Sequence, residues 1–125
     1  MPSVWIKVLL IVCGIYDGVL GVVALLIPST VFRLAGVTPP NHLGYVQFPA
    51  LLLLIFAIMF FRAAGDPVAR RDTIAYGMAL KASYFGLVFY YKLNGGVPEL
   101  WIPCALADMV FFALFLVAWK QVARR

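Results

Sequence analysis

Three charged side chains lie inside long apolar stretches of this sequence, where ionised groups are least expected. Asp17, Lys81 and Asp108 are each flanked on both sides by many apolar residues. A buried charge is costly unless it is paired. If the three groups lie at the same depth, the ammonium group is therefore expected to pair with a carboxylate. When all three are ionised the trio has an excess of one negative charge, and such a group can bind a proton, an ion or a polar headgroup.

Four long apolar runs carry these charges, over residues 4–27, 44–64, 73–93 and 100–120. Each has about 20 residues or more, the length that a helix needs to cross a hydrocarbon core of ~30 Å. The chain is 65% hydrophobic and only 12% charged, and its mean hydropathy is +1.01. A soluble domain is roughly 45–50% apolar. The sequence therefore predicts one all-α transmembrane domain over residues 1–125, a four-transmembrane-helix antiparallel bundle in up-down-up-down order.

Short links with turn-forming residues separate the runs. The first run ends at a proline, after which Ser29 or Thr30 is expected to cap a short amphipathic turn that closes at Gly36. The later links contain Gly65-Asp66-Pro67 and Asn94-Gly95-Gly96. Links this short predict that consecutive helices run antiparallel as neighbours.

Basic residues are distributed unequally between the two sides of this predicted bundle. One side receives Lys7, Arg62, Arg70, Arg71, Lys120, Arg124 and Arg125. The other side receives Arg33 and Lys92. Because Lys and Arg accumulate on the cytoplasmic side, we expect a multi-pass protein of the cell inner (plasma) membrane with both termini cytoplasmic. Basic residues that flank apolar runs, rather than forming one soluble face, also argue against a nucleic-acid partner.

The three buried charges are expected at similar depths. At a rise of ~1.5 Å per residue, Asp17 lies ~15 Å, Asp108 ~12 Å and Lys81 ~18 Å below the outer end of its run. The three side chains are therefore expected in one slab near the middle of the bundle, where they could meet. Tyr84 lies one turn beyond Lys81 on the same face and could hydrogen-bond a carboxylate. Tyr16 is a second candidate for such a bond.

This cluster has more than one interpretation. It could be a static ion pair between Lys81 and one aspartate, with the other aspartate protonated, which fixes the register of the helices. It could instead be a polar pocket that binds a proton, an ion or a headgroup. A third possibility is that the depths are misaligned and the groups never meet.

A second group of polar residues is expected near the outer mouth of the bundle, where His42 and Gln47 face Glu99 from the opposite link. A lone histidine there is more simply a cap or an interfacial residue than a ligand. The sequence contains no nucleophile–base pair, no metal motif and no CxxC, so no catalytic residue, metal or cofactor is predicted. Cys13 and Cys104 differ in depth by ~15 Å, which is too far for a disulfide.

Three sequence blocks are distinctive rather than generic apolar filler: YDGVLG at 16–21, TPPNHLGYVQFP at 38–49 and YGMALKASY at 76–84. Together they resemble small uncharacterised bacterial integral membrane proteins of four spans, and the resemblance runs along nearly the whole chain. The plan is also similar, in architecture only, to DoxX-like proteins. Neither resemblance implies an activity.

Three classes of function follow from these features. We favour a non-enzymatic accessory or structural subunit that lies in the lipid bilayer and packs against other membrane subunits or as a homo-oligomer. The first alternative is a small proton- or ion-coupled transporter that uses the buried Asp/Lys cluster. The second is a lipid- or quinone-binding membrane enzyme or redox partner that uses the outer-mouth residues.

Overall fold

The computed structural model describes residues 3–123, which form five α-helices. These are α1 (Val4–Leu26), α2 (Pro28–Ala35), α3 (Gly44–Gly65), α4 (Arg71–Leu93) and α5 (Trp101–Ala123). The predicted all-α class is confirmed. The four long helices begin and end within three residues of the predicted apolar runs.

The helix α2 occupies the place of the amphipathic turn that was expected after the first run. It begins at Pro28, whose fixed backbone angle and missing N–H suit the first position of a helix. Ile27 precedes it without a side-chain capping bond, so the predicted cap by Ser29 or Thr30 is wrong. Gly36 ends the helix in the left-handed conformation, with φ of 70°, which glycine adopts without strain.

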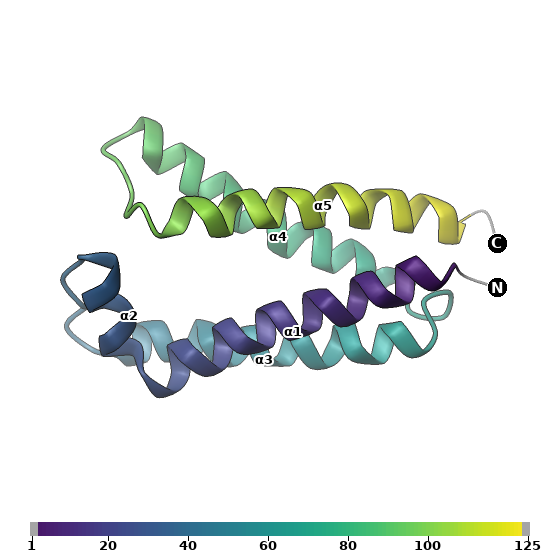
Figure 1. Cartoon of the computed structure of the whole chain (residues 1–125), viewed down its shortest axis with the longest axis horizontal. Helices are drawn as coiled ribbons and strands as arrows, with labels where there is room; N and C mark the ends of the chain where they lie inside the picture. Colours follow the sequence, from purple (N-terminus) through teal and green to yellow (C-terminus); the bar gives the residue numbers. More distant parts are fainter. Residues whose placement is uncertain (1–2, 124–125) are drawn as a thin grey trace.

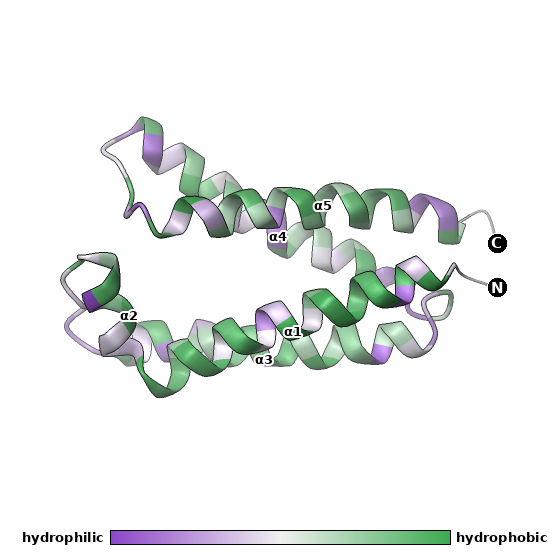
Figure 2. Ribbon diagram, viewed as in Figure 1, coloured by the Kyte–Doolittle hydropathy of each residue, from purple (hydrophilic) through white to green (hydrophobic). Residues whose placement is uncertain are grey.

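Three of the helices, α1, α3 and α5, are long and apolar enough to cross a membrane. The chain is therefore a polytopic membrane protein by length and composition. The helix α4 is as long as α1, at 23 residues, but it is not among these three candidates. Figure 2 shows the difference, because α1, α3 and α5 are mostly green whereas α4 has paler and purple segments. Lys81 and several tyrosines lower its hydropathy.

The long helices form two antiparallel pairs, which we call the first pair (α1 and α3) and the second pair (α4 and α5). Helices within a pair pack along much of their length, whereas α3 and α4 have few contacts although they follow one another in the chain. The link over residues 66–70 holds their ends together but does not fix their crossing angle. The helix α4 therefore diverges from α3 and packs against α5 (Figure 1).

Glycines let the two helices of the first pair approach closely. A Cβ added at Gly21 would lie 2.9 Å from the backbone oxygen of Ala50, and one added at Gly18 would lie 3.5 Å from the Cβ of Ala57. Small residues at such contacts are typical of helix packing within membranes. The glycine face of α1 therefore packs against α3.

The apolar core lies at the end of the molecule where both ends of the described chain are found (Figure 1). It joins all four long helices, through Ile6, Leu9, Leu10, Cys13, Phe60, Ala63, Ala64, Ile74, Phe115, Ala118 and Val122. The rings of Phe60 and Phe115 lie 5.5 Å apart, and Gly77 of α4 packs directly against both rings. The two pairs are therefore in contact at this end and separate towards α2 and the 94–100 link.

Candidate functional site

The three charged residues of the apolar runs meet between the two helix pairs. The Nζ of Lys81 lies 2.7 Å from an oxygen of Asp17 and 3.1 Å from an oxygen of Asp108. Asp17 comes from α1, Lys81 from α4 and Asp108 from α5, so the cluster joins the first pair to the second. Among residues 3–123, these are the only two ion pairs.

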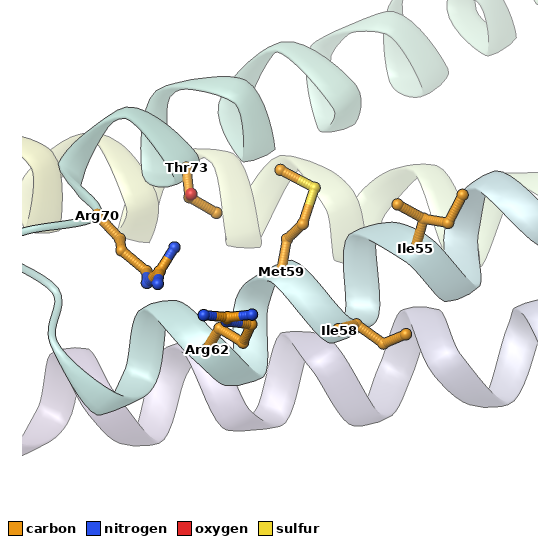
Figure 3. Close-up of a pocket in the computed structure, with 6 residues that line it drawn as sticks. All are labelled: Ile55, Ile58, Met59, Arg62, Arg70 and Thr73. Atoms are coloured by element: carbon orange, nitrogen blue, oxygen red, sulfur yellow. The ribbon is translucent and has the colours of Figure 1, made fainter.

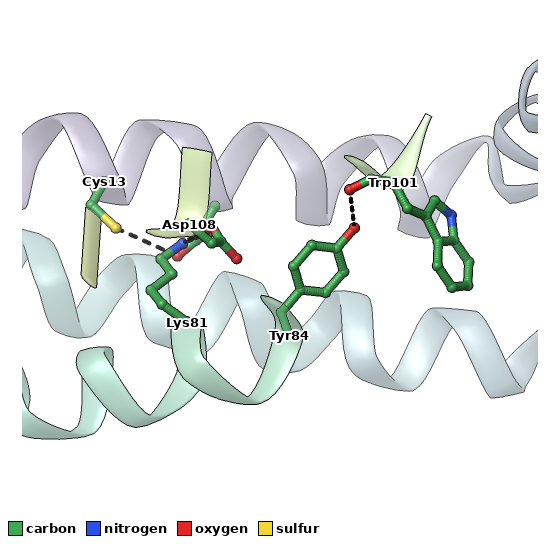
Figure 4. Close-up of polar contacts among 6 residues, drawn as sticks. Cys13, Lys81, Tyr84, Trp101 and Asp108 are labelled. Carbon is green, nitrogen blue, oxygen red and sulfur yellow. Dashed lines mark hydrogen bonds and ion pairs between the residues drawn. The ribbon is translucent and has the colours of Figure 1, made fainter. Parts of the chain in front are cut away.

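The cluster is almost completely enclosed by protein. Lys81 is 1% exposed, Asp17 2% and Asp108 7%. The thiol of Cys13, one turn before Asp17 on α1, lies 3.7 Å from the second oxygen of that carboxylate and donates to it. Figure 4 shows this thiol pointing at the cluster from one side while Lys81 reaches it from another. The charges are thus compensated within the protein, as charges buried away from water must be.

Aromatic rings cover the ammonium group of Lys81. Its Nζ lies 5.2 Å from the ring centre of Tyr16 and 5.1 Å from that of Phe111. The two rings lie 5.3 Å apart. A cation within about 6 Å of an aromatic face is stabilised by the ring electrons. Tyr16 therefore contacts the cluster through its ring.

The cluster lies beside the apolar core that joins the two helix pairs. The apolar core occupies the turns on one side of it, at Cys13, Ile74 and Phe115. Further along α1, Gly21 packs against Ala50 of α3, within the first pair. The ion pairs therefore add a polar connection between the two pairs beside the apolar core.

The composition of the cluster defines its chemistry. Two carboxylates face one ammonium group, so one negative charge is uncompensated when all three are ionised. A bound proton or cation would neutralise it. Among residues 3–123, every fully buried side-chain nitrogen and oxygen has a hydrogen-bond partner. The hydrogen bonds and ion pairs of the cluster therefore form a complete network.

Tyr84 lies near the cluster but does not bond to it. Its hydroxyl group donates a hydrogen bond of 3.4 Å to the backbone carbonyl of Trp101, at the start of α5. Figure 4 shows the ring directed away from Lys81 towards Trp101. Tyr84 therefore ties α4 to α5 and does not hydrogen-bond a carboxylate.

The outer residues His42, Gln47 and Glu99 are not brought together. The Nδ1 of His42 accepts a hydrogen bond of 2.9 Å from the backbone of Gly44, so it caps the start of α3. The side-chain amide of Gln47 donates to the carbonyl of Leu25, at the end of α1. Glu99 lies exposed in the link of the second pair. Within residues 3–123 no hydrogen bond or ion pair joins Glu99 to either of the others.

The cysteines are free, with Cys13 buried and Cys104 half-buried. Within residues 3–123, no group of three or more histidine, cysteine, aspartate or glutamate side chains could hold a metal ion. Sequence reasoning considered Cys13 only as a partner for a disulfide and missed its bond to Asp17. The spacing of four residues between them on one helix was the signal that could have found it. The contribution of Phe111 had no comparable signal, because phenylalanines are common throughout the apolar runs.

The fold and the site together define a polytopic, all-α membrane protein with a buried polar cluster of one lysine and two aspartates. No family model, curated protein or solved structure matches this chain.

Proposed function

We propose that this protein is a four-span membrane protein, with α4 as its fourth span, and that it serves as an accessory or structural subunit. Three features of α4 support its role as a span. It has the same length as α1 and α5, it packs antiparallel to α5, and its buried lysine is paired with two carboxylates. Pairing removes much of the cost of placing such a charge among apolar groups.

The orientation of the four spans follows from the positions of the basic residues. Both ends of the described chain lie at one end of the molecule, which also carries the link at 66–70 (Figure 1). Arg70 lies in this link, and Arg62 and Arg71 lie in the helices on either side of it. The opposite end carries Arg33 and Lys92. The rule that basic residues accumulate inside supports cytoplasmic termini in a cell inner membrane.

The observation that carries the proposed function is an exposed face of small residues on α4. Ala79, Ser83 and Gly86 are exposed and lie between Tyr76 and Tyr90, which are 60% and 58% exposed. These five positions are separated by alternating steps of three and four residues, so they form one stripe along the helix. Small residues let a second helix approach closely, which drives helix association in membranes, where lipid gives little hydrophobic force. This stripe supports packing against a second copy or another membrane subunit.

The stripe gives a direct prediction for association. Gly86→Leu is expected to reduce self-association or partner copurification about tenfold or more, because a large side chain would hold the second helix away. The change should not disturb the single chain, since a Cβ at Gly86 meets no atom within 4 Å. Oligomer mass in mild detergent, measured by light scattering together with identification of copurified proteins, checks this prediction.

The matched control for this test is Ala113→Leu, which places the same large side chain on an exposed position of α5. It is expected to leave association unchanged. A stable monomer without partners in the unmodified protein would contradict the proposed function. Equal loss of association in both variants would show that the stripe on α4 is not the contact.

In this proposal the buried cluster acts as a clamp. Lys81 links α4 to α1 and α5, and so connects the two helix pairs. The ion pairs would fix the angle between the two helix pairs. They would thereby also fix the direction in which the stripe on α4 faces a partner.

A second candidate function, a small proton- or cation-coupled transporter, is favoured by the composition of the cluster, which has two carboxyl groups for one ammonium group. The cluster lies between two helix pairs. In many transporters, two such bundles rock against each other around a binding site between them. This candidate rests on the same three residues and excludes a purely static role for them.

Transport would be detected as flux in proteoliposomes. If the cluster carries protons, the unmodified protein should change the pH of the vesicle lumen when a proton gradient is imposed. Asp108→Asn should abolish this flux, because it removes one of the two carboxylates. Asp72→Asn, at an exposed position at the start of α4, is the control and should retain the flux. Absence of proton and simple-cation flux in the unmodified protein removes this candidate.

A further inference from the structure

A pocket of about 360 Å³ lies between the end of α3 and the start of α4, remote from the buried cluster. It is lined by Ile55, Ile58, Met59, Arg62, Arg70 and Thr73. Figure 3 shows the guanidinium groups of Arg62 and Arg70 close together between the two helices, with Met59, Ile58 and Ile55 further along α3. The pocket thus combines two positive charges with an apolar wall.

The two arginines of this pocket have no acidic partner within residues 3–123, where the ion pairs belong to Lys81 alone. The neighbouring Asp66 instead accepts a hydrogen bond from the backbone of Ala69. Arg71 differs, because its guanidinium group stacks 3.7 Å above the ring of Trp119 and its Nε donates to the carbonyl of the same residue. Of the three arginines in this region, Arg71 stabilises the fold, whereas Arg62 and Arg70 are available to an anion.

The apolar wall continues along one face of α3 into the membrane. Ile55, Ile58, Met59 and Arg62 are spaced as residues of one helix face. At a rise of ~1.5 Å per residue, Ile58 lies ~6 Å and Ile55 ~10 Å deeper than Arg62. Both isoleucines are exposed, at 60% and 53%. A molecule that carries a negative headgroup and an apolar chain would match the pocket in both charge and polarity.

We propose that this pocket is a binding site for an anionic phospholipid. The headgroup phosphate accepts hydrogen bonds from Arg62 and Arg70, since guanidinium groups match the geometry of phosphate oxygens. One acyl chain lies along Ile58 and Ile55. Basic pockets between spans at the cytoplasmic side are suited to such headgroups. The proposal depends on the membrane location of α3 but not on the stripe of α4 or on the role of the buried cluster.

The test is a titration of the purified full chain in mild detergent with phosphatidylglycerol, followed by native mass spectrometry, with phosphatidylcholine and inorganic phosphate as separate arms. Phosphatidylglycerol is expected to bind more tightly than phosphatidylcholine. Arg62→Gln together with Arg70→Gln should weaken phosphatidylglycerol binding about 25-fold, or about fivefold for each arginine. Arg62→Lys together with Arg70→Lys should retain part of the affinity, which shows that the glutamine variant has lost charge rather than fold.

The matched control is Arg33→Gln together with Lys92→Gln, which removes the same charge from the opposite end of the molecule. It should leave phosphatidylglycerol binding unchanged. Equal weakening by both double variants would overturn the proposal, because binding would then follow net charge alone. Equal affinity for the two lipids would also overturn it, and displacement of the lipid by inorganic phosphate would assign the pocket to free phosphate instead.

Discussion

Replacing Lys81 with methionine is expected to destabilise the folded protein by about 3–5 kcal/mol, the cost of leaving a buried ion network without one partner. Lys81 is 1% exposed and holds the carboxylates of Asp17 and Asp108 at 2.7 and 3.1 Å. Without the ammonium group, two negative charges would face each other away from water. Denaturant or thermal unfolding in detergent micelles, followed by circular dichroism, measures the change.

The control for this prediction is Lys92→Met, which makes the same substitution at an exposed position of the same helix. It should change stability by no more than about 0.5 kcal/mol. If the loss in Lys81→Met comes from unpaired carboxylates, adding Asp17→Asn and Asp108→Asn to that variant should recover much of the stability. A Lys81→Met protein as stable as Lys92→Met would show that the ion network does not hold the helix pairs together.

Single aspartate changes separate the two members of the network. Asp17→Asn leaves Lys81 paired with Asp108, and Asp108→Asn leaves it paired with Asp17, so each variant keeps one balanced ion pair. Both should therefore be less destabilised than Lys81→Met. Asp17 accepts from both Lys81 and Cys13, so Asp17→Asn should be the more destabilising of the two.

Replacing Gly77 with leucine is expected to destabilise the protein by about 3 kcal/mol, at the upper end of the range for overpacked cores. A Cβ at Gly77 would lie 2.7 Å from a ring carbon of Phe60 and 2.8 Å from one of Phe115. These rings are fully buried and pack against each other, so neither has free space to move into. The larger side chain would push α4 away from the core that joins the two helix pairs.

The matched control is Gly86→Leu on the same helix, where a Cβ would meet nothing within 4 Å. Both changes replace a helical glycine with the same residue, so they share any gain in helix propensity. Their difference in unfolding free energy therefore reports packing at Gly77. Equal stability of the two variants, measured on chains that are monomeric in detergent, would contradict the close contact between α4 and the rings.

The sequence by itself determined where the helices lie and how deep their charges are. Apolar runs of span length must satisfy every backbone hydrogen bond internally, so they form helices whose ends can be read from the runs. A helix has a fixed rise per residue, and depth along it is therefore a matter of counting. That is why Asp17, Lys81 and Asp108 could be assigned to one slab from their numbers.

The tertiary structure decided which faces meet. Counting residues does not give the rotation of a helix about its axis or the angle at which two helices cross, since both depend on side-chain packing. For this reason α4 pairs with α5 rather than α3, and Tyr84 bonds to Trp101 rather than to a carboxylate. The divergence of the two helix pairs likewise leaves Glu99 apart from His42 and Gln47. The short link between α3 and α4 keeps Arg62 and Arg70 beside each other, and only the positions of their side chains show that they share one pocket.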